Sequence, residues 1–143
     1  FINLDKILKK SDYGKISLNK IQNINDKNII FLKNKENDLK KDEENLNKKK
    51  NILSDEEFQK ELNLLRNKIK NYRNTKDQLV KDFDNKRSGI LNNFFSNINP
   101  IIQEYMNKNS IEILFEQKNV FIGKTSSDIT NIIIEEINKK KFK

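Results

Sequence analysis

The chain of 143 residues contains no cysteine, no histidine and no tryptophan. Without cysteine there is no disulfide and no thiolate nucleophile, and without cysteine and histidine the usual zinc and haem ligands are missing. Histidine is also the commonest general base near neutral pH, so its absence argues against acid–base catalysis. We therefore expect no catalytic residue, no cofactor and no metal site, and a protein that is not an enzyme.

Glycine and proline are also scarce. The chain has three glycines and one proline, and none of them lies between Lys15 and Ser88. Because these residues are the strongest helix breakers, the stretch can run as helix. No run of 18 apolar residues exists, so we expect no transmembrane helix. The scarcity of glycine and proline therefore predicts long helices, and we do not expect these helices to span a membrane.

A change of register divides this stretch into two helices. The first helix, from Lys15 to about Asn51, carries a leucine at every seventh position. A coiled coil has a second apolar position in each repeat, but here that position is charged. The second begins at Ser54, which with Glu57 matches a capping box. The leucines of the repeat are Leu32, Leu39, Leu46 and Leu53. We predict an antiparallel two-helix coiled-coil arm over residues 15–97 whose tip lies near 51–57.

The remaining residues predict a small body, formed by 1–14 and 98–143. Alternation of apolar residues indicates strands at 1–4, 111–115 and 120–122, and a final helix follows Ser127 and Asp128, with Ile129, Ile132, Ile133 and Ile137 inward. Three strands cannot close a barrel, so we expect copies of the chain to complete one another's sheet. The expected fold class is α+β, mostly α. The oligomerisation residues would be Phe1, Ile2, Leu4, Ile111, Ile113, Phe115, Val120 and Ile122.

Positive charge is concentrated on the returning helix. The chain carries a net charge of +8, of which +4 lies in residues 61–100. Such a helix could attract an acidic polypeptide, an anionic lipid or a nucleic acid. A solvated helix face in a lysine-rich protein fits the same residues. The candidate binding residues are Arg66, Lys70, Tyr72, Arg73, Leu79, Phe83 and Arg87.

Several short motifs follow one another along the chain. They are the opening residues 1–8, Ser11 with Gly14 and Lys15, the restart at 54–58, residues 98–102, the strand at 111–115 and the final helix start at 127–130. Taken in this order, they resemble the Skp/OmpH family of periplasmic chaperones. The resemblance covers nearly the whole chain. The chain departs from the usual family pattern in its 24 asparagines, its 21 isoleucines and its lack of alanine.

The resemblance implies a jellyfish-like homotrimer in which a β body carries three helical hairpins around a cavity. It further implies an ATP-independent holdase that binds unfolded outer-membrane proteins in the periplasm, with a signal peptide already removed. Lipopolysaccharide or an anionic membrane surface is a further implied partner, although no motif places such a site. The high content of asparagine, lysine and isoleucine is typical of a low-GC genome. The resemblance implies that this genome is that of a Gram-negative bacterium.

A second interpretation comes from another class of protein. A basic coiled coil could serve as a scaffold or bind nucleic acid, and it would then bind DNA or RNA with a steep salt dependence. No nucleic-acid-binding fold is visible in the sequence, so no nucleic-acid partner is expected.

Overall fold

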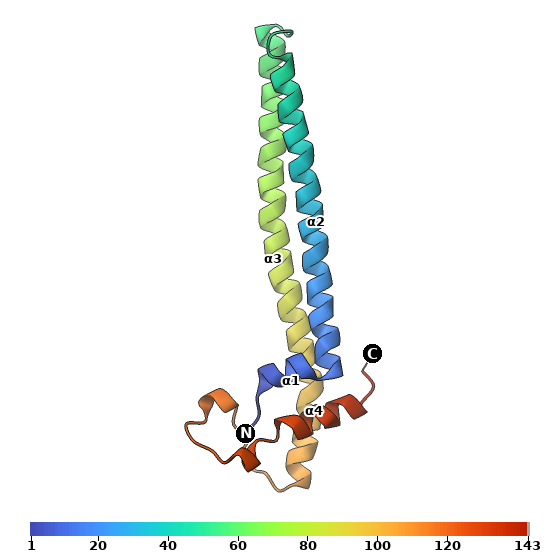
Figure 1. The fold of residues 1–143 in the computed structure, drawn as a ribbon, viewed down its shortest axis with the longest axis vertical. Coiled ribbons are helices and arrows are strands. Elements are labelled where there is room, and N and C mark those ends of the chain that lie inside the picture. Colours follow the sequence, from blue (N-terminus) through green and yellow to red (C-terminus); the bar gives the residue numbers. More distant parts are fainter. Residues whose placement is uncertain (143) are drawn as a thin grey trace. The chain divides into compact units, whose positions relative to one another are not determined.

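The computed structural model describes residues 1–142 and is mostly helical (Figure 1). Its elements are α1 (Leu4–Lys10), α2 (Asp12–Lys49), α3 (Asp55–Lys108), α4 (Thr130–Lys139) and two 3-10 turns, η1 (Gln117–Asn119) and η2 (Thr125–Ser127). The chain divides into two compact units. The body unit is Phe1–Gln22 with the chain from Lys86 onward, and the hairpin unit is Asn23–Asn85.

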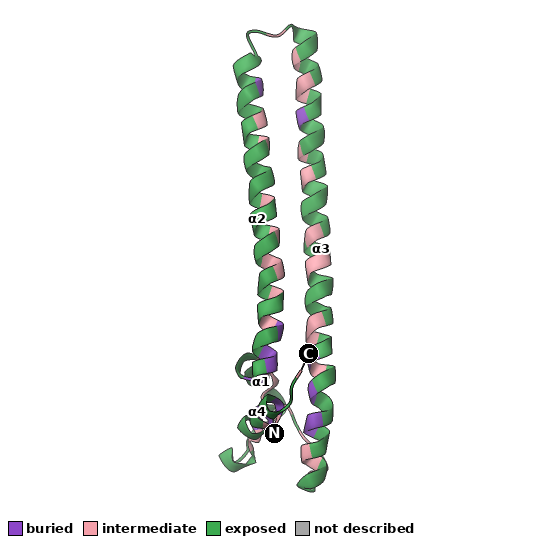
Figure 2. Ribbon diagram, turned by 90° about the vertical axis from the view of Figure 1, so that its right-hand side faces the viewer, coloured by how far each residue is buried: buried purple, intermediate pink, exposed green. Residues whose placement is uncertain are grey.

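The hairpin unit consists of the facing parts of α2 and α3. The two helices run antiparallel because the chain reverses between Lys49 and Asp55. Leu46 and Leu65 are the buried apolar side chains of this unit, and the other seam residues are half-buried. Figure 2 shows these residues as a narrow stripe on helices that are otherwise exposed. The two predicted long helices are confirmed, whereas the bounds of 15–97 for the arm stay a prediction beside a compact unit of Asn23–Asn85.

Local capping decides where α3 begins. The backbone N–H of Glu57 donates to the Ser54 hydroxyl at 3.3 Å, and the backbone N–H of Ser54 donates to the Glu57 carboxylate at 3.1 Å. This reciprocal pair is the predicted capping box. Pro100 lies inside α3, which continues to Lys108, so the proline does not end the helix.

A second cap joins α1 to α2 in the body unit. Asn3 caps α1 by accepting from the backbone N–H of Lys6 at 2.8 Å. Ser11 ends α1, and its hydroxyl accepts from the backbone N–H of Gly14 at 3.1 Å. A Cβ at Gly14 would lie 2.0 Å from the carbonyl oxygen of Leu8. The join is therefore too tight for any side chain at this position.

The core of the body unit draws apolar side chains from all four helices and from the first residues of the chain. Phe94 and Ile98 of α3 and Ile133 and Ile137 of α4 are fully buried. The complete cluster is Ile2, Ile7, Tyr13, Phe94, Ile98, Ile101, Ile102, Ile133, Ile134 and Ile137. This part of the chain has the packed core that the hairpin unit lacks.

The prediction for α4 needs one correction. Ile132 is exposed, and Ile134 is buried in its place. The helix begins at Thr130, whose backbone N–H donates to Asp128 at 2.9 Å and whose hydroxyl also donates to that carboxylate. Because this start places residues 130, 133, 134 and 137 on one face, Ile132 points away from the core. Ile133 and Ile137 are inward as predicted.

The predicted strands do not form in the single chain. Among residues 1–142 the β-pairing is one isolated parallel bridge between Ile2 and Glu116, in which Ile2 donates to Phe115 at 3.0 Å and Gln117 donates to Ile2 at 2.7 Å. Asn3 caps a helix, which ends any strand at 1–4. The hairpin at 110–123 is replaced by η1, because Val120 donates back to Gln117 at 3.0 Å rather than across to 111–115. The single chain is thus mostly α, without the expected β body.

Candidate functional site

The seam of the hairpin unit is closed by polar contacts where apolar residues are missing. Lys68 Nζ lies 2.6 Å from the carboxylate of Asp42, and Lys49 Nζ lies 3.1 Å from that of Glu61. The Tyr72 hydroxyl donates to the Glu36 carboxylate, and this bond raises the pKa of Tyr72, as ionisation would break it. Exposed ion pairs add little stability. The two helices are therefore weakly joined along this stretch.

An open hollow lies between the helices beside these contacts. It has a volume of about 360 Å³. Phe31 is 43% exposed there, and Lys35 Nζ lies 5.7 Å from the centroid of its ring. The lining residues are Phe31, Lys35, Asp38, Leu39, Asp42, Lys68, Asn71, Tyr72 and Thr75. The hollow follows from the sequence, since seam positions 35 and 42 hold charged residues that cannot fill it with packed carbon atoms.

The structure separates the predicted binding residues into two groups. Arg66, Lys70 and Arg73 are exposed neighbours on one face of α3, where they border a shallow hollow with Ile69 and Asn74. Among residues 1–142 none of these three cations has an ion-pair partner. Together they form the cationic face of the hairpin unit.

The other predicted binding residues are placed differently. Tyr72, Leu79 and Phe83 are half-buried, and Tyr72 bonds to the opposite helix. Arg87 is exposed and belongs to the body unit. The structure therefore brings together only Arg66, Lys70 and Arg73 as a free charged surface, and Tyr72 serves the seam.

The body unit exposes apolar side chains in the segment between α3 and α4. Of the predicted oligomerisation residues, Ile113, Phe115 and Ile122 are exposed and Ile2 is buried. The remaining members, Phe1, Leu4, Ile111 and Val120, are half-buried. Phe121, which was not on the predicted list, is 99% exposed. An exposed apolar group of this size in one short segment is unusual for a monomer surface.

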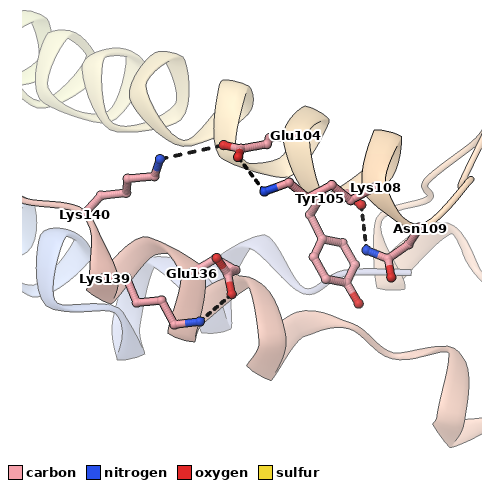
Figure 3. Close-up of polar contacts among 7 residues, drawn as sticks. All are labelled: Glu104, Tyr105, Lys108, Asn109, Glu136, Lys139 and Lys140. Carbon is pink, nitrogen blue, oxygen red and sulfur yellow. Dashed lines mark hydrogen bonds and ion pairs between the residues drawn. The ribbon is translucent and has the colours of Figure 1, made fainter.

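The end of α4 makes contacts that the sequence did not predict. Glu104 of α3 accepts from Lys108 at 2.7 Å and lies 3.7 Å from Lys140, and the hydrogen bond and charge of Lys108, followed by the charge of Lys140, lower the pKa of Glu104 (Figure 3). In the same view Lys139 donates to Glu136 at 2.7 Å, and Asn109 donates to the backbone oxygen of Tyr105 at 2.8 Å. The basic end is tied to α3 through residue 140.

Phe142 extends this contact into the core. Its ring stacks on Tyr13 with centroids 4.1 Å apart. A lone phenylalanine among lysines, close to the last residue of the sequence, carried no periodic signal, so the sequence reasoning missed it. Phe142 therefore adds an aromatic contact to the ion pair of Lys140, and Lys143 lies outside the described residues.

The described residues offer neither a cluster of metal ligands nor a membrane-spanning helix. Within residues 1–142 no three acidic side chains gather in an arrangement that could hold a metal ion. In the same part of the chain no helix is both long and apolar enough to cross a membrane.

Fold and surface together define a protein that couples a packed helical body unit to a long, thinly packed helical hairpin. The model of the outer membrane protein (OmpH-like) family matches residues 1–137. The chain therefore belongs to the OmpH-like family, which confirms the resemblance found in its motifs.

A solved structure shares the fold. The crystal structure of a Caulobacter crescentus protein, assigned as an OmpH-like outer membrane chaperone, superposes with a TM-score of 0.90 at 15% sequence identity. The alignment covers 96% of this chain and 82% of the Caulobacter chain. At this identity the likeness establishes the fold. No curated protein matches the sequence.

Proposed function

We propose that this protein is an ATP-independent holdase chaperone that binds unfolded outer-membrane β-barrel proteins and prevents their aggregation. The observation that carries the proposal is the hairpin unit, whose two helices expose most of their surface and present Arg66, Lys70 and Arg73 without ion-pair partners. Family membership supports the same function. No catalytic role is proposed.

Client binding would rest on many weak contacts rather than on one deep pocket. Three neighbouring cations attract acidic segments of an unfolded chain and raise the rate of encounter. Half-exposed apolar residues such as Phe31 then contact apolar segments of the client. Such a surface holds a client without imposing a structure on it, as a holdase requires.

We propose further that three copies assemble through the body unit. Ile113, Phe115 and Ile122 are exposed in the single chain, and residues 111–115 belong to no helix or strand. Unpaired extended segments pair readily with other chains. The expected β body would then be completed in a homotrimer, in which the hairpins surround a shared cavity. Light-scattering mass tests this, and a monomer in dilute solution would contradict it.

The decisive experiment dilutes an unfolded outer-membrane β-barrel protein into buffer and follows its aggregation by light scattering. A trimer-to-client excess is expected to suppress aggregation without ATP. Exchange of Arg66, Lys70 and Arg73 for glutamine should weaken the suppression of aggregation. The control exchange of Lys40, Lys41 and Lys48 for glutamine removes the same charge from α2 and should weaken suppression less. Unchanged aggregation with the wild type would sink the proposal, and equal effects of the two triple variants would remove the cationic face from it.

The periplasm of a low-GC Gram-negative bacterium is the proposed location, reached with a cleavable leader. The codons upstream of Phe1 test this, because a charged and apolar leader is expected there. Lipopolysaccharide or an anionic membrane surface is a further proposed partner. Vesicles with and without lipopolysaccharide test it by co-sedimentation, and equal binding to neutral vesicles would remove it.

A basic scaffold or nucleic-acid-binding module is the alternative function. The net charge of +4 over residues 61–100 favours it. Affinity for DNA or RNA that falls steeply with salt, together with no effect on client aggregation, would select this alternative.

A further inference from the structure

Three aromatic rings form a stack in the body unit, and its outer ring comes from residues after α4. Tyr13, in the first turn of α2, lies with its centroid 5.5 Å from that of Phe94 in α3, and Phe142 lies 4.1 Å from Tyr13 with an angle of 14° between the rings. Phe94 is fully buried and Phe142 is half-buried. The outer ring is therefore the accessible member of the stack.

The Tyr13 ring is held in a fixed orientation. Its hydroxyl accepts from the side-chain amide of Asn97 at 2.7 Å and from that of Asn93 at 3.2 Å. Both asparagines lie on α3, as does Phe94, which packs on the ring. A binding surface fixed in advance loses little freedom when a ligand arrives. Tyr13 thus offers a ready platform for a flat apolar group.

The segment that covers this platform is lightly attached. We call residues 140–142 the tail segment. The backbone N–H of Lys140 bonds to Ile137 at 3.0 Å, and its side chain reaches the exposed Glu104 at 3.7 Å (Figure 3). Among residues 1–142, Lys141 and Phe142 form no backbone hydrogen bond. Segments with few buried contacts and few backbone bonds open at low free energy.

We propose that Tyr13 is a binding site for an aromatic side chain of an unfolded polypeptide, and that Phe142 occupies this site until a client displaces it. The bound phenyl ring of Phe142 shows directly what the site accepts. Outer-membrane β-barrels carry girdles of aromatic residues at both membrane interfaces, so the clients of the proposed function supply such groups. The inference rests on that proposed function and names a client feature and a site for it in the body unit.

Displacement sets the expected affinity. A ligand that competes with the tail segment binds only the open fraction, so its apparent dissociation constant rises as that fraction falls. If the site is open for about one tenth of the time, removal of the Phe142 ring tightens binding about tenfold. A site that prefers a flat ring should also discriminate against leucine.

The test measures binding of a fluorescein-labelled Gly-Lys-Gly-Phe-Gly-Lys-Gly peptide by anisotropy, with the matched peptide in which leucine replaces phenylalanine. Phe142→Ala is expected to bind the phenylalanine peptide about tenfold more tightly than the wild type does, and to bind the leucine peptide more weakly than the phenylalanine peptide. Lys141→Ala is the control, because Lys141 is an exposed neighbour that leaves the stack intact. Equal affinity of Phe142→Ala and wild type for the phenylalanine peptide, or equal affinity of Phe142→Ala for the two peptides, overturns the proposal.

A second variant keeps the test decisive if Phe142→Ala does not fold. The chain has no tryptophan, so Phe142→Trp introduces a single tryptophan as a fluorescent reporter into the stack. An excess of unlabelled phenylalanine peptide should shift its emission to the red and lower its anisotropy, and the leucine peptide should not. Unchanged emission with both peptides overturns the proposal. If the peptides do not bind as expected but client aggregation is still suppressed, only the Tyr13 site is excluded. If the peptide binds but aggregation is not suppressed, the holdase function is excluded and the Tyr13 site is retained.

Discussion

The body unit and the hairpin unit are built on the same two long helices but are stabilised differently. Phe94 and Ile98 of α3 are fully buried in the body unit, whereas Phe83 of the same helix is half-buried in the hairpin unit. In the body unit α1, α4 and Ile2 contribute to the core as well. A pair of helices alone can bury only one stripe of each partner. The number of packing partners, and not helix formation, therefore distinguishes the closely packed body unit from the thinly packed hairpin unit.

The largest expected difference between the units comes from the same substitution on the same helix. Phe94→Ala should lower the free energy of unfolding by about 3–5 kcal/mol, because it leaves a cavity in a closed core. Phe83→Ala should lower it by roughly 1 kcal/mol, since water already reaches that side chain. Denaturant unfolding followed by circular dichroism measures both. Equal losses would show that the hairpin unit is as well packed as the body unit.

Two glycines sharpen the comparison of close packing with open surface. Gly14→Ala should lower the free energy of unfolding by about 1–3 kcal/mol, because its Cβ would collide with the backbone of Leu8. A Cβ at Gly89 meets no atom within 4 Å, so Gly89→Ala should raise the free energy by about 0.5–1 kcal/mol through better helix propensity. Thermal melting gives the two signs, and a stabilised Gly14→Ala would refute the tight join between α1 and α2.

The cap at the tip tests whether local bonds stabilise the hairpin unit. Ser54→Ala should lower stability by about 1 kcal/mol at neutral pH. The backbone N–H of Ser54, and then its hydroxyl, lower the pKa of Glu57. A lowered carboxylate pKa contributes stability that is present above the ordinary glutamate pKa and is lost as the pH falls through the lowered pKa.

The difference in melting temperature between Ser54→Ala and wild type should therefore become smaller in acid. Ser88→Ala is the control, because Ser88 is exposed inside α3 and makes no cap. A gap that stays constant with pH would exclude Glu57 from the cap.

The smallest expected effect is that of the ion pair across the seam. A double-mutant cycle with Lys68→Gln and Asp42→Asn should give a coupling of less than about 1 kcal/mol that decreases with salt. The control cycle on Lys60 and Glu56, an ion pair within α3, should give about 0.3–0.5 kcal/mol. A coupling across the seam well above this range would mean that the hairpin unit is less adaptable than proposed.

Local signals in the sequence predicted the helices well. The glycine-free stretch, the leucine repeat and the Ser54 capping box each depend on residues close together in the chain, and all three appear in α2 and α3. The predicted strands are not formed in the single chain, because a strand needs a partner from elsewhere and alternation at 111–115 carries no information about that partner. Ile132 and Ile134 were exchanged because helical spacing fixes which residues share a face, whereas packing against the rest of the body unit decides which face is buried.

The candidate site was predicted only in part for the same reason. Arg66, Lys70 and Arg73 share a face through helical spacing alone, so the sequence located them together. Tyr72 was assigned to client binding, but the opposite helix supplies Glu36 as its partner. The stack of Phe142 on Tyr13 joins residues at the two ends of the sequence, and no local pattern announces such a pair.

Composition and spacing by themselves determined the long helices, the thin seam between them and the concentration of positive charge on the returning helix, because these properties follow from neighbours within one or two turns. Only the tertiary structure decided which residues close the core of the body unit, that a single chain leaves residues 111–116 without a ladder, and that Phe142 covers Tyr13. These features depend on contacts between residues that are distant in the sequence, and the free energy of such contacts exists only once the chain has folded.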